Sequence, residues 1–113
     1  MTDTTVDVTR DGSSAILRIR GEITGGSEAP IMAAYTEAGD ARSIILDFSN
    51  LDYMNSGGIG LLVTLLVRTQ RAGQKLLAVG LSEHYKQILS LTRLDEAIAI
   101  HDDETTALAA ASA

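Results

Sequence analysis

The sequence contains no cysteine, which excludes disulfide bridges, thiolate metal sites and a cysteine nucleophile. Tryptophan is also absent, and one phenylalanine and three tyrosines are too few for the aromatic platforms that bind single-stranded nucleic acid. Basic residues are scarce: 9 Lys and Arg oppose 15 Asp and Glu, and this formal net charge of −6 disfavours contact with a phosphate backbone. We therefore expect no nucleic-acid partner.

Long hydrophobic runs are missing as well. No stretch approaches the roughly 20 apolar residues that a membrane-spanning helix needs, and the start, Met-Thr-Asp-Thr-Thr, lacks the basic and apolar regions of a secretory signal. These absences predict a cytoplasmic protein without membrane insertion. With 113 residues, 45% of them hydrophobic, the chain can bury the core of one domain, 1–113, whose Ala-rich segment 107–113 is expected to fray.

The spacing of apolar residues predicts the order of strands and helices. Apolar and polar residues alternate over 5–9 and 15–20 around an Asp11-Gly12 turn, which indicates an antiparallel hairpin. Helical spacing then alternates with short apolar runs, which predicts helices at 27–38, at 56–72, after Ser82 and from 102 onward, and strands at 43–48, 75–80 and 97–100. This ββαβαβαβα order predicts an α/β fold: a mostly parallel, four- to five-stranded mixed sheet that starts with the hairpin and has helices packed against it.

The segment 47–60 carries the most information about function. An apolar strand leads through a short extension at 51–54 to Ser56, at the mouth of a helix whose apolar residues cover more than one face and so predict burial. Glycines at positions 57, 58 and 60 cost roughly 1 kcal/mol each in a helix interior, and a helix opening without side chains lets a backbone or a phosphate approach closely. The simpler interpretation is that Asn55 or Ser56 caps the helix.

Catalytic and cofactor motifs do not fit this segment. A nucleophile elbow needs a glycine two positions before the serine, where Met54 stands. A dinucleotide fingerprint lacks its third glycine, because Val63 occupies that place, and the Gly-Lys-Ser/Thr ending of a P-loop is missing. His84 and His101 have no neighbours at metal-ligand spacing, and Asp47 is interpreted as a turn or surface carboxylate. We therefore expect neither an enzyme nor a cofactor or metal site.

Four segments follow one another in a recognisable order. They are Leu17–Ile23, which ends in Gly-Glu-Ile, then Ile45–Ser49, Tyr53–Gly60 and Ile88–Leu94. In order and spacing they resemble the STAS domains of the bacterial anti-sigma factor antagonist family, over nearly the whole chain. Tyr53–Gly60 is similar to the family signature Asp-Ser-Ser/Thr-Gly-Leu/Ile-Gly, and Leu17–Ile23 to a strand followed by Gly-Glu-Leu-Asp. The resemblance implies the STAS fold.

The resemblance also implies a phosphorylation switch at Ser56. In the family, an anti-sigma factor serine kinase of the histidine-kinase-like ATPase type phosphorylates the serine at this position, and a PP2C-type phosphatase removes the phosphate. The unphosphorylated domain binds the kinase and thereby frees the sigma factor. The glycine pair after Ser56 would leave room for the kinase's nucleotide, and the chain would be the phosphoacceptor. The implied partner surface consists of Thr24, Tyr53, Met54, Asn55, Ser56, Gly57 and Gly58.

Three positions differ from the family pattern. Thr24 and Asn55 stand where the family usually has aspartate, and Gly57 replaces the second Ser or Thr of the signature. Two loop carboxylates are therefore missing. The alternative function is a STAS interaction module of another assembly, such as a lipid-transport accessory or a signalling scaffold, in which Ser56 is only a helix cap. A hydrolase that uses Ser56 would need a histidine and an acid that no motif supplies.

Overall fold

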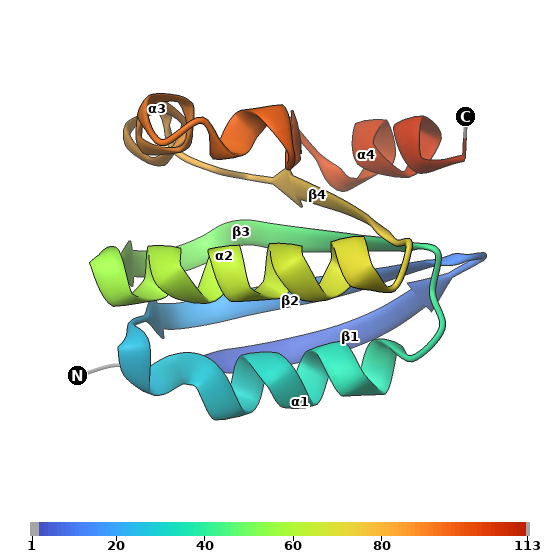
Figure 1. Cartoon of the computed structure of the whole chain (residues 1–113), viewed down its shortest axis with the longest axis horizontal. Helices are drawn as coiled ribbons and strands as arrows, with labels where there is room; N and C mark the ends of the chain where they lie inside the picture. The colour runs from blue at the N-terminus through green and yellow to red at the C-terminus, as the bar shows by residue number, and fades with distance from the viewer. Residues whose placement is uncertain (1–2, 113) are drawn as a thin grey trace.

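A computed structural model describes residues 3–112 of the chain, which form a five-stranded sheet in the order β1-β2-β3-β4-β5 (Figure 1). Two single turns of 3-10 helix, η1 (Gly25–Ser27) and η2 (Leu94–Glu96), lie between the main elements. The order of elements is the predicted one. In chain order they are β1 (Thr5–Asp11), β2 (Ser14–Ile23), α1 (Glu28–Ala38), β3 (Ser43–Met54), α2 (Ser56–Arg71), β4 (Lys75–Val79), α3 (Glu83–Leu91), β5 (Ala99–His101) and α4 (Glu104–Ala111).

The sheet is mixed, as predicted. β1 and β2 form an antiparallel hairpin, and β2, β3, β4 and β5 run parallel to one another. Gly12 in the hairpin turn has a φ of 62°, a conformation that glycine adopts without steric cost. Because each helix between parallel strands returns the chain to the same end of the sheet, the carboxyl ends of β2, β3 and β4 lie at one edge of the fold.

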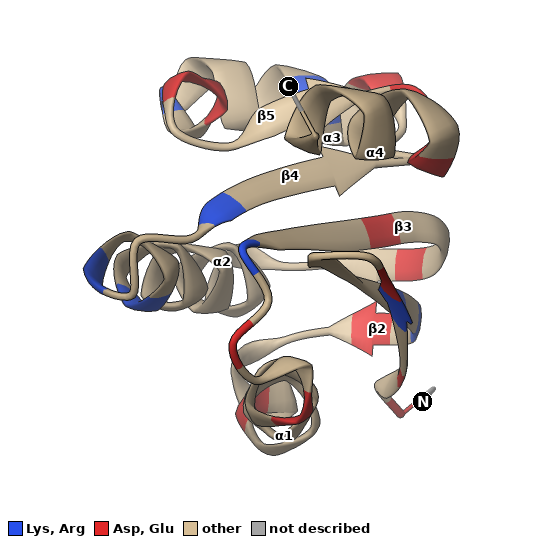
Figure 2. Ribbon diagram, turned by 90° about the vertical axis from the view of Figure 1, so that its right-hand side faces the viewer, with Lys and Arg blue, Asp and Glu red and all other residues tan. Residues whose placement is uncertain are grey.

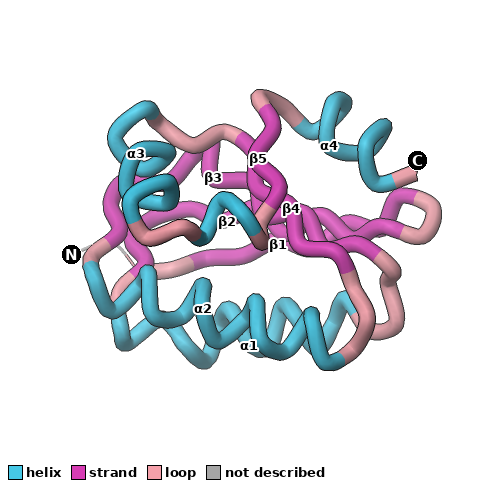
Figure 3. The backbone as a smooth tube through the Cα atoms, turned by 45° about the horizontal axis from the view of Figure 1, so that its top comes forward, coloured by secondary structure: helices cyan, strands magenta, loops and turns pink. Residues whose placement is uncertain are grey.

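Helices cover the two faces of the sheet unequally. α1 and α2 lie on one side and α4 on the other, where α4 packs on β3, β4 and β5 and also reaches Ile16 of β2 (Figure 2). Figure 3 shows the same strands between the α1–α2 layer and α4. The larger core, to which α1, α2 and α3 contribute, includes Leu17, Ile44, Leu46, Leu62 and Leu89. The smaller core beneath α4 consists of Ile16, Ile45, Leu77, Val79 and Ala107.

The last strand differs from the sequence prediction. The last strand is Ala99–His101 and not 97–100, because the amides of Ala97 and Ile98 both donate to the carbonyl of Leu94 at the end of the η2 turn. Ile98 is nevertheless buried, and its burial explains the strand-like pattern. In the segment expected to fray, 107–113, α4 continues as far as Ala111 and Ala107 is fully buried, and the fraying stays a prediction. Position 113 lies outside the described residues.

β3 is longer than the predicted strand 43–48. It continues through the predicted extension 51–54 and stays paired with β2 as far as Ile23 and Met54, with register shifts on the way. Its pairing with β4 ends earlier, at Asp47 and Val79. The last seven residues of β3 therefore project beyond β4, and α2 begins two residues after they end.

The helices are short in comparison with a lipid bilayer. Within residues 3–112, no helix is both long enough and apolar enough to cross a membrane.

Candidate functional site

Ser56 is the first residue of α2, and the preceding residue, Asn55, caps the helix. The side-chain oxygen of Asn55 accepts a hydrogen bond from the amide of Gly58 at 3.0 Å, and the backbone of Asn55 is extended, as is usual for an N-cap. Of the two residues that the sequence offered as the cap, the structure therefore selects Asn55. The hydroxyl of Ser56 is left out of the capping interaction.

The Ser56 side chain is exposed, and among the described residues its hydroxyl has no hydrogen-bond partner. It lies at the positive end of the α2 dipole. The first amides of a helix have no partner inside the helix, and Asn55 satisfies only that of Gly58. Ser56 therefore combines an accessible hydroxyl with a local environment that accepts negative charge.

Two of the three glycines after Asn55 are explained by packing within the chain. A Cβ on Gly57 would lie 2.6 Å from the amide nitrogen of Gly25 in η1. A Cβ on Gly58 would collide with the carbonyl oxygen of Ile23, and Gly58 itself is buried. These glycines let η1 and the end of β2 approach α2. Packing within the chain therefore accounts for both glycines, and the room they would leave for a kinase's nucleotide stays a prediction.

Thr24 caps η1 through a pair of reciprocal hydrogen bonds. Its hydroxyl accepts from the amide of Gly26 at 3.2 Å, and its own amide donates to the hydroxyl of Ser27 at 2.9 Å. Because η1 packs against the start of α2 through Gly25 and Gly57, the structure brings Thr24 and Ser56 to the same end of the fold. Thr24 and Asn55 thus act as N-caps at the two positions where the family usually has aspartate.

Tyr53 and Met54 have different environments. The side chain of Met54 is 5% exposed and belongs to the larger core, whereas Tyr53 is 48% exposed. Of the seven residues predicted to form the partner surface, Met54 and Gly58 are therefore interior residues. The other five reach the surface to some extent: Thr24, Tyr53, Asn55, Ser56 and Gly57.

An exposed stripe along α2 was missed by sequence reasoning, which expected this helix to be largely buried. Val63 and Val67 are 41% and 39% exposed. Ser56, Gly60, Val63 and Val67 follow one another at intervals of four, three and four residues, so all four lie on one helix face. A Cβ on Gly60 would meet nothing within 4 Å, so no packing inside the chain explains this glycine. We call Ser56, Gly60, Val63 and Val67 the α2 stripe.

The main charge cluster lies on the opposite face of the sheet, beneath α4. The guanidinium of Arg18 donates two hydrogen bonds to the carboxylate of Glu104, at 2.9 and 2.8 Å, and lowers the pKa of Glu104 to about 2. Burial and the neighbouring Glu104 carboxylate raise the pKa of Asp47. Asp47 accepts a hydrogen bond from the amide of Ser49 at 2.8 Å, but it is a half-buried residue within β3, so its interpretation as a turn or surface carboxylate is wrong. The Arg18–Glu104 pair attaches α4 to β2. The cluster contains none of the seven residues of the predicted partner surface.

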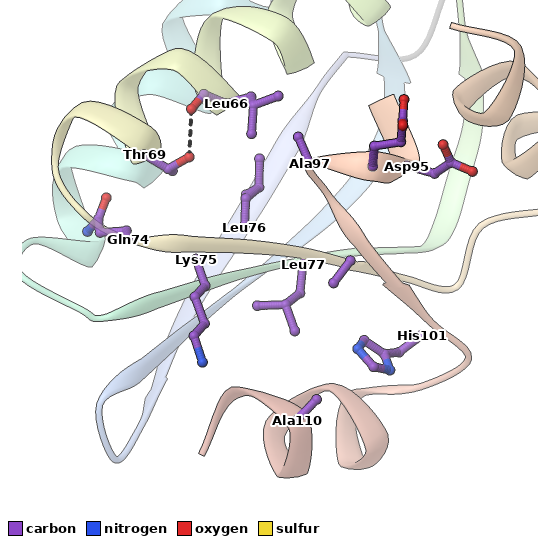
Figure 4. Close-up of a pocket in the computed structure, with 12 residues that line it drawn as sticks. Leu66, Thr69, Gln74, Lys75, Leu76, Leu77, Asp95, Ala97, His101 and Ala110 are labelled. Atoms are coloured by element: carbon purple, nitrogen blue, oxygen red, sulfur yellow. Dashed lines mark hydrogen bonds between the residues drawn. The ribbon is translucent and has the colours of Figure 1, made fainter. Parts of the chain in front are cut away.

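A cavity of about 410 Å³ opens at the edge of β4, which the short strand β5 leaves partly uncovered (Figure 4). Its lining includes Leu66, Thr69, Lys75, Leu77 and His101, at the far end of α2 from Ser56. Thr69 is buried there and donates to the carbonyl of Leu66. No group of three or more His, Asp or Glu within the described part of the chain is placed to hold a metal ion. The cavity is separate from the α2 stripe.

Comparisons with known proteins show the family and the fold of this chain. The STAS domain family matches residues 5–107. A Thermotoga maritima protein proposed to be an anti-sigma factor antagonist superimposes with a TM-score of 0.84 at 20% identity, over 96% of this chain and 95% of that one. The Bacillus anti-sigma factor antagonist SpoIIAA in its phosphorylated form gives 0.71 at 18% identity, over 92% and 96%.

A third similar structure is a sulfate transporter family protein from Wolinella succinogenes, with a TM-score of 0.78 at 19% identity, over 92% of this chain and 88% of that one. At such identities, the three likenesses show a shared fold. Together with the family match over residues 5–107, they show that this chain belongs to the STAS domain family and has the STAS fold.

Proposed function

We propose that this chain is an anti-sigma factor antagonist that is switched at Ser56. In its unphosphorylated form it binds an anti-sigma factor kinase of the histidine-kinase-like ATPase type and so frees the sigma factor. The kinase transfers phosphate from ATP to the Ser56 hydroxyl, which ends the interaction, and a PP2C-type phosphatase restores the binding form. The chain is the phosphoacceptor and not the enzyme.

The observation that carries the proposal is the free hydroxyl of Ser56 beside a helix cap made by another residue. Because Asn55 caps α2, Ser56 can be modified without loss of the capping hydrogen bond at Gly58. A phosphate adds roughly −1.5 to −2 charges and three acceptor oxygens, and the helix dipole stabilises negative charge at this end. Phosphorylation would therefore change the surface of the domain and leave its fold in place.

The α2 stripe supports the binding part of the proposal. Val63 and Val67 expose apolar surface on the same helix face as Ser56, and Gly60, between Ser56 and Val63, leaves the backbone open to close approach. A partner seated on this stripe would bury the Ser56 hydroxyl at its edge. The added charge and bulk of a phosphate would then have to be desolvated in the interface, which opposes binding.

A second candidate is a STAS interaction module of another assembly, such as a transport accessory or a signalling scaffold, without a phosphoswitch. The likeness to the sulfate transporter family protein favours it, as does the replacement of aspartate by Thr24 and Asn55. In that case the α2 stripe would still be an interface, and Ser56 would only begin the helix.

Displacement of a sigma factor tests the binding proposal. The chain is titrated into a preformed complex of anti-sigma factor kinase and sigma factor, and the released sigma factor is measured for wild type, Val63→Ser and Leu91→Ser. We expect wild type to displace it, and Val63→Ser to need at least several-fold more protein, because a serine loses the apolar contact. Leu91, on α3, is 77% exposed and outside the stripe, so Leu91→Ser is the matched control.

No displacement by wild type, from a kinase that another antagonist does engage, would contradict the function. An equal loss in both variants would show instead that the α2 stripe is not the binding surface.

A further inference from the structure

The strand that leads to Ser56 lacks a partner along one edge. β3 loses its pairing with β4 after Asp47, whereas it remains paired with β2 as far as Met54. The space beside the projecting part of β3 is a cavity of about 260 Å³, closed on its other side by the turn between β4 and α3. The lining includes Phe48, Leu51, Asp52, Leu81 and Tyr85.

Tyr85 of α3 replaces the missing strand at the end of this edge. Its hydroxyl accepts a hydrogen bond from the amide of Met54 at 2.9 Å. The next amide, that of Asn55, donates at 3.2 Å to the carbonyl of Ile23 in β2. Two consecutive amides directly before Ser56 are thus held from different elements, one by α3 and one by β2. Without the Tyr85 hydroxyl, the amide of Met54 would lose its acceptor, and of the two amide hydrogen bonds only that of Asn55 to β2 would remain.

The Tyr85 ring is itself well fixed. It packs against the larger core, its amide donates to the capping hydroxyl of Ser82 at 3.3 Å, and its ring lies edge-on to that of His84 at 5.1 Å between centroids. The hydroxyl is therefore presented by a side chain that packs against the core from the start of α3. A loosely held tyrosine could not restrict the β3–α2 turn in this way.

We propose that Tyr85 is a positioning residue for the Ser56 site. Its hydroxyl holds the β3–α2 turn so that Ser56 is presented in one conformation to the partner. The assignment rests on the proposed function for the identity of that partner, but the restraint on the turn is a property of the chain alone. Phosphoryl transfer depends on alignment of the attacking oxygen, so a looser turn lowers the rate even though Tyr85 does not touch the reacting atoms.

Amide hydrogen exchange of the full chain tests the restraint, with Tyr85→Phe compared with Tyr35→Phe. Tyr35 is the matched control, since its hydroxyl also makes one hydrogen bond, to Gln74 at 2.6 Å, far from Ser56. Loss of one hydrogen bond should speed exchange at Met54 and Asn55 by roughly three- to tenfold in Tyr85→Phe. Tyr35→Phe should leave these two amides unchanged. Equal exchange at Met54 in the two variants would overturn the proposal.

The rate of phosphate transfer to Ser56 tests the consequence. With the anti-sigma factor kinase and Mg-ATP, kcat/KM for Tyr85→Phe should fall several-fold below that of Tyr35→Phe, while both variants keep the same far-UV spectrum. Faster exchange at Met54 with an unchanged kcat/KM would also overturn the positioning role. If no kinase modifies wild type, the proposed function fails, and the exchange comparison alone still decides whether Tyr85 holds the turn.

Discussion

The side-chain oxygen of Asn55 lies 3.0 Å from the amide nitrogen of Gly58 and caps α2, so that the neighbouring Ser56 begins the helix with its hydroxyl unused. This arrangement separates two roles that the sequence alone could assign to either residue. Asn55 stabilises the helix, and Ser56 remains available for chemistry or contact.

Because Asn55 and Ser56 have separate roles, substitution by alanine should lower the free energy of unfolding by different amounts at the two positions. Asn55→Ala should destabilise the chain by about 1 kcal/mol, because the Gly58 amide loses its acceptor. Asn55→Asp should retain the cap and gain from the helix dipole. Ser56→Ala should change stability by less than about 0.5 kcal/mol. Urea unfolding measures all three, and a larger loss for Ser56→Ala than for Asn55→Ala would show that Ser56 is the cap.

The glycines of α2 provide a second pair of variants. Gly57→Ala should destabilise by about 1 to 3 kcal/mol, because its Cβ would lie 2.6 Å from the Gly25 amide nitrogen and η1 would have to move. Gly60→Ala should stabilise by up to about 1 kcal/mol, since its Cβ enters open space and alanine favours the helix. Thermal unfolding distinguishes them, and a gain in Tm for Gly57→Ala would contradict the close contact with η1.

Much of the fold follows from the sequence, because its periodic patterns and turns are local. The hairpin, the order of elements and the starts of α2 and α3 were all predicted from such signals. Features that depend on contact with a distant segment of the chain were not predicted. Gly57 is required by its contact with Gly25, the end of β3 is held by Tyr85 of α3, and Val63 is exposed because no other helix of residues 3–112 covers it.

The same limit applies to the charge cluster under α4. Arg18 and Glu104 are 86 residues apart, and no local pattern connects them. Their ion pair nevertheless leads to a prediction about pH. The pKa of Glu104 in the folded chain is about 2, below its ordinary value of 4.5. Its contribution to the stability of the fold is therefore complete above pH 4.5 and is lost as the pH falls toward 2. The raised pKa of Asp47 acts in the opposite direction and offsets part of this loss.

Glu104→Gln should therefore be less stable than wild type at neutral pH, and the difference should shrink between pH 4.5 and 2. Glu28→Gln, at an exposed site in the first turn of α1, is the control. Chemical denaturation at a series of pH values gives the comparison. A constant difference between Glu104→Gln and wild type down to pH 2 would argue against the Arg18–Glu104 pair.

Negative charge at Ser56 should act on binding and not on the fold. Ser56→Asp should weaken binding to the kinase by at least tenfold, because the carboxylate must be desolvated in the interface, while unfolding free energy changes by less than about 0.5 kcal/mol. Gln87→Glu adds the same charge at an exposed position of α3 and should leave affinity nearly unchanged. Titration calorimetry and thermal unfolding of the same samples separate the two effects. Equal affinities for Ser56→Asp and Gln87→Glu would remove Ser56 from the interface.

In the proposed switch, the hydroxyl of Ser56 accepts the phosphate. The most direct test of this step is the intact mass of wild type and of Ser56→Ala after incubation with an anti-sigma factor kinase and Mg-ATP. We expect one added phosphate on wild type and none on Ser56→Ala. An unmodified wild-type chain, beside another antagonist that the same kinase does phosphorylate, would contradict the proposed switch, as would a phosphate on Ser56→Ala.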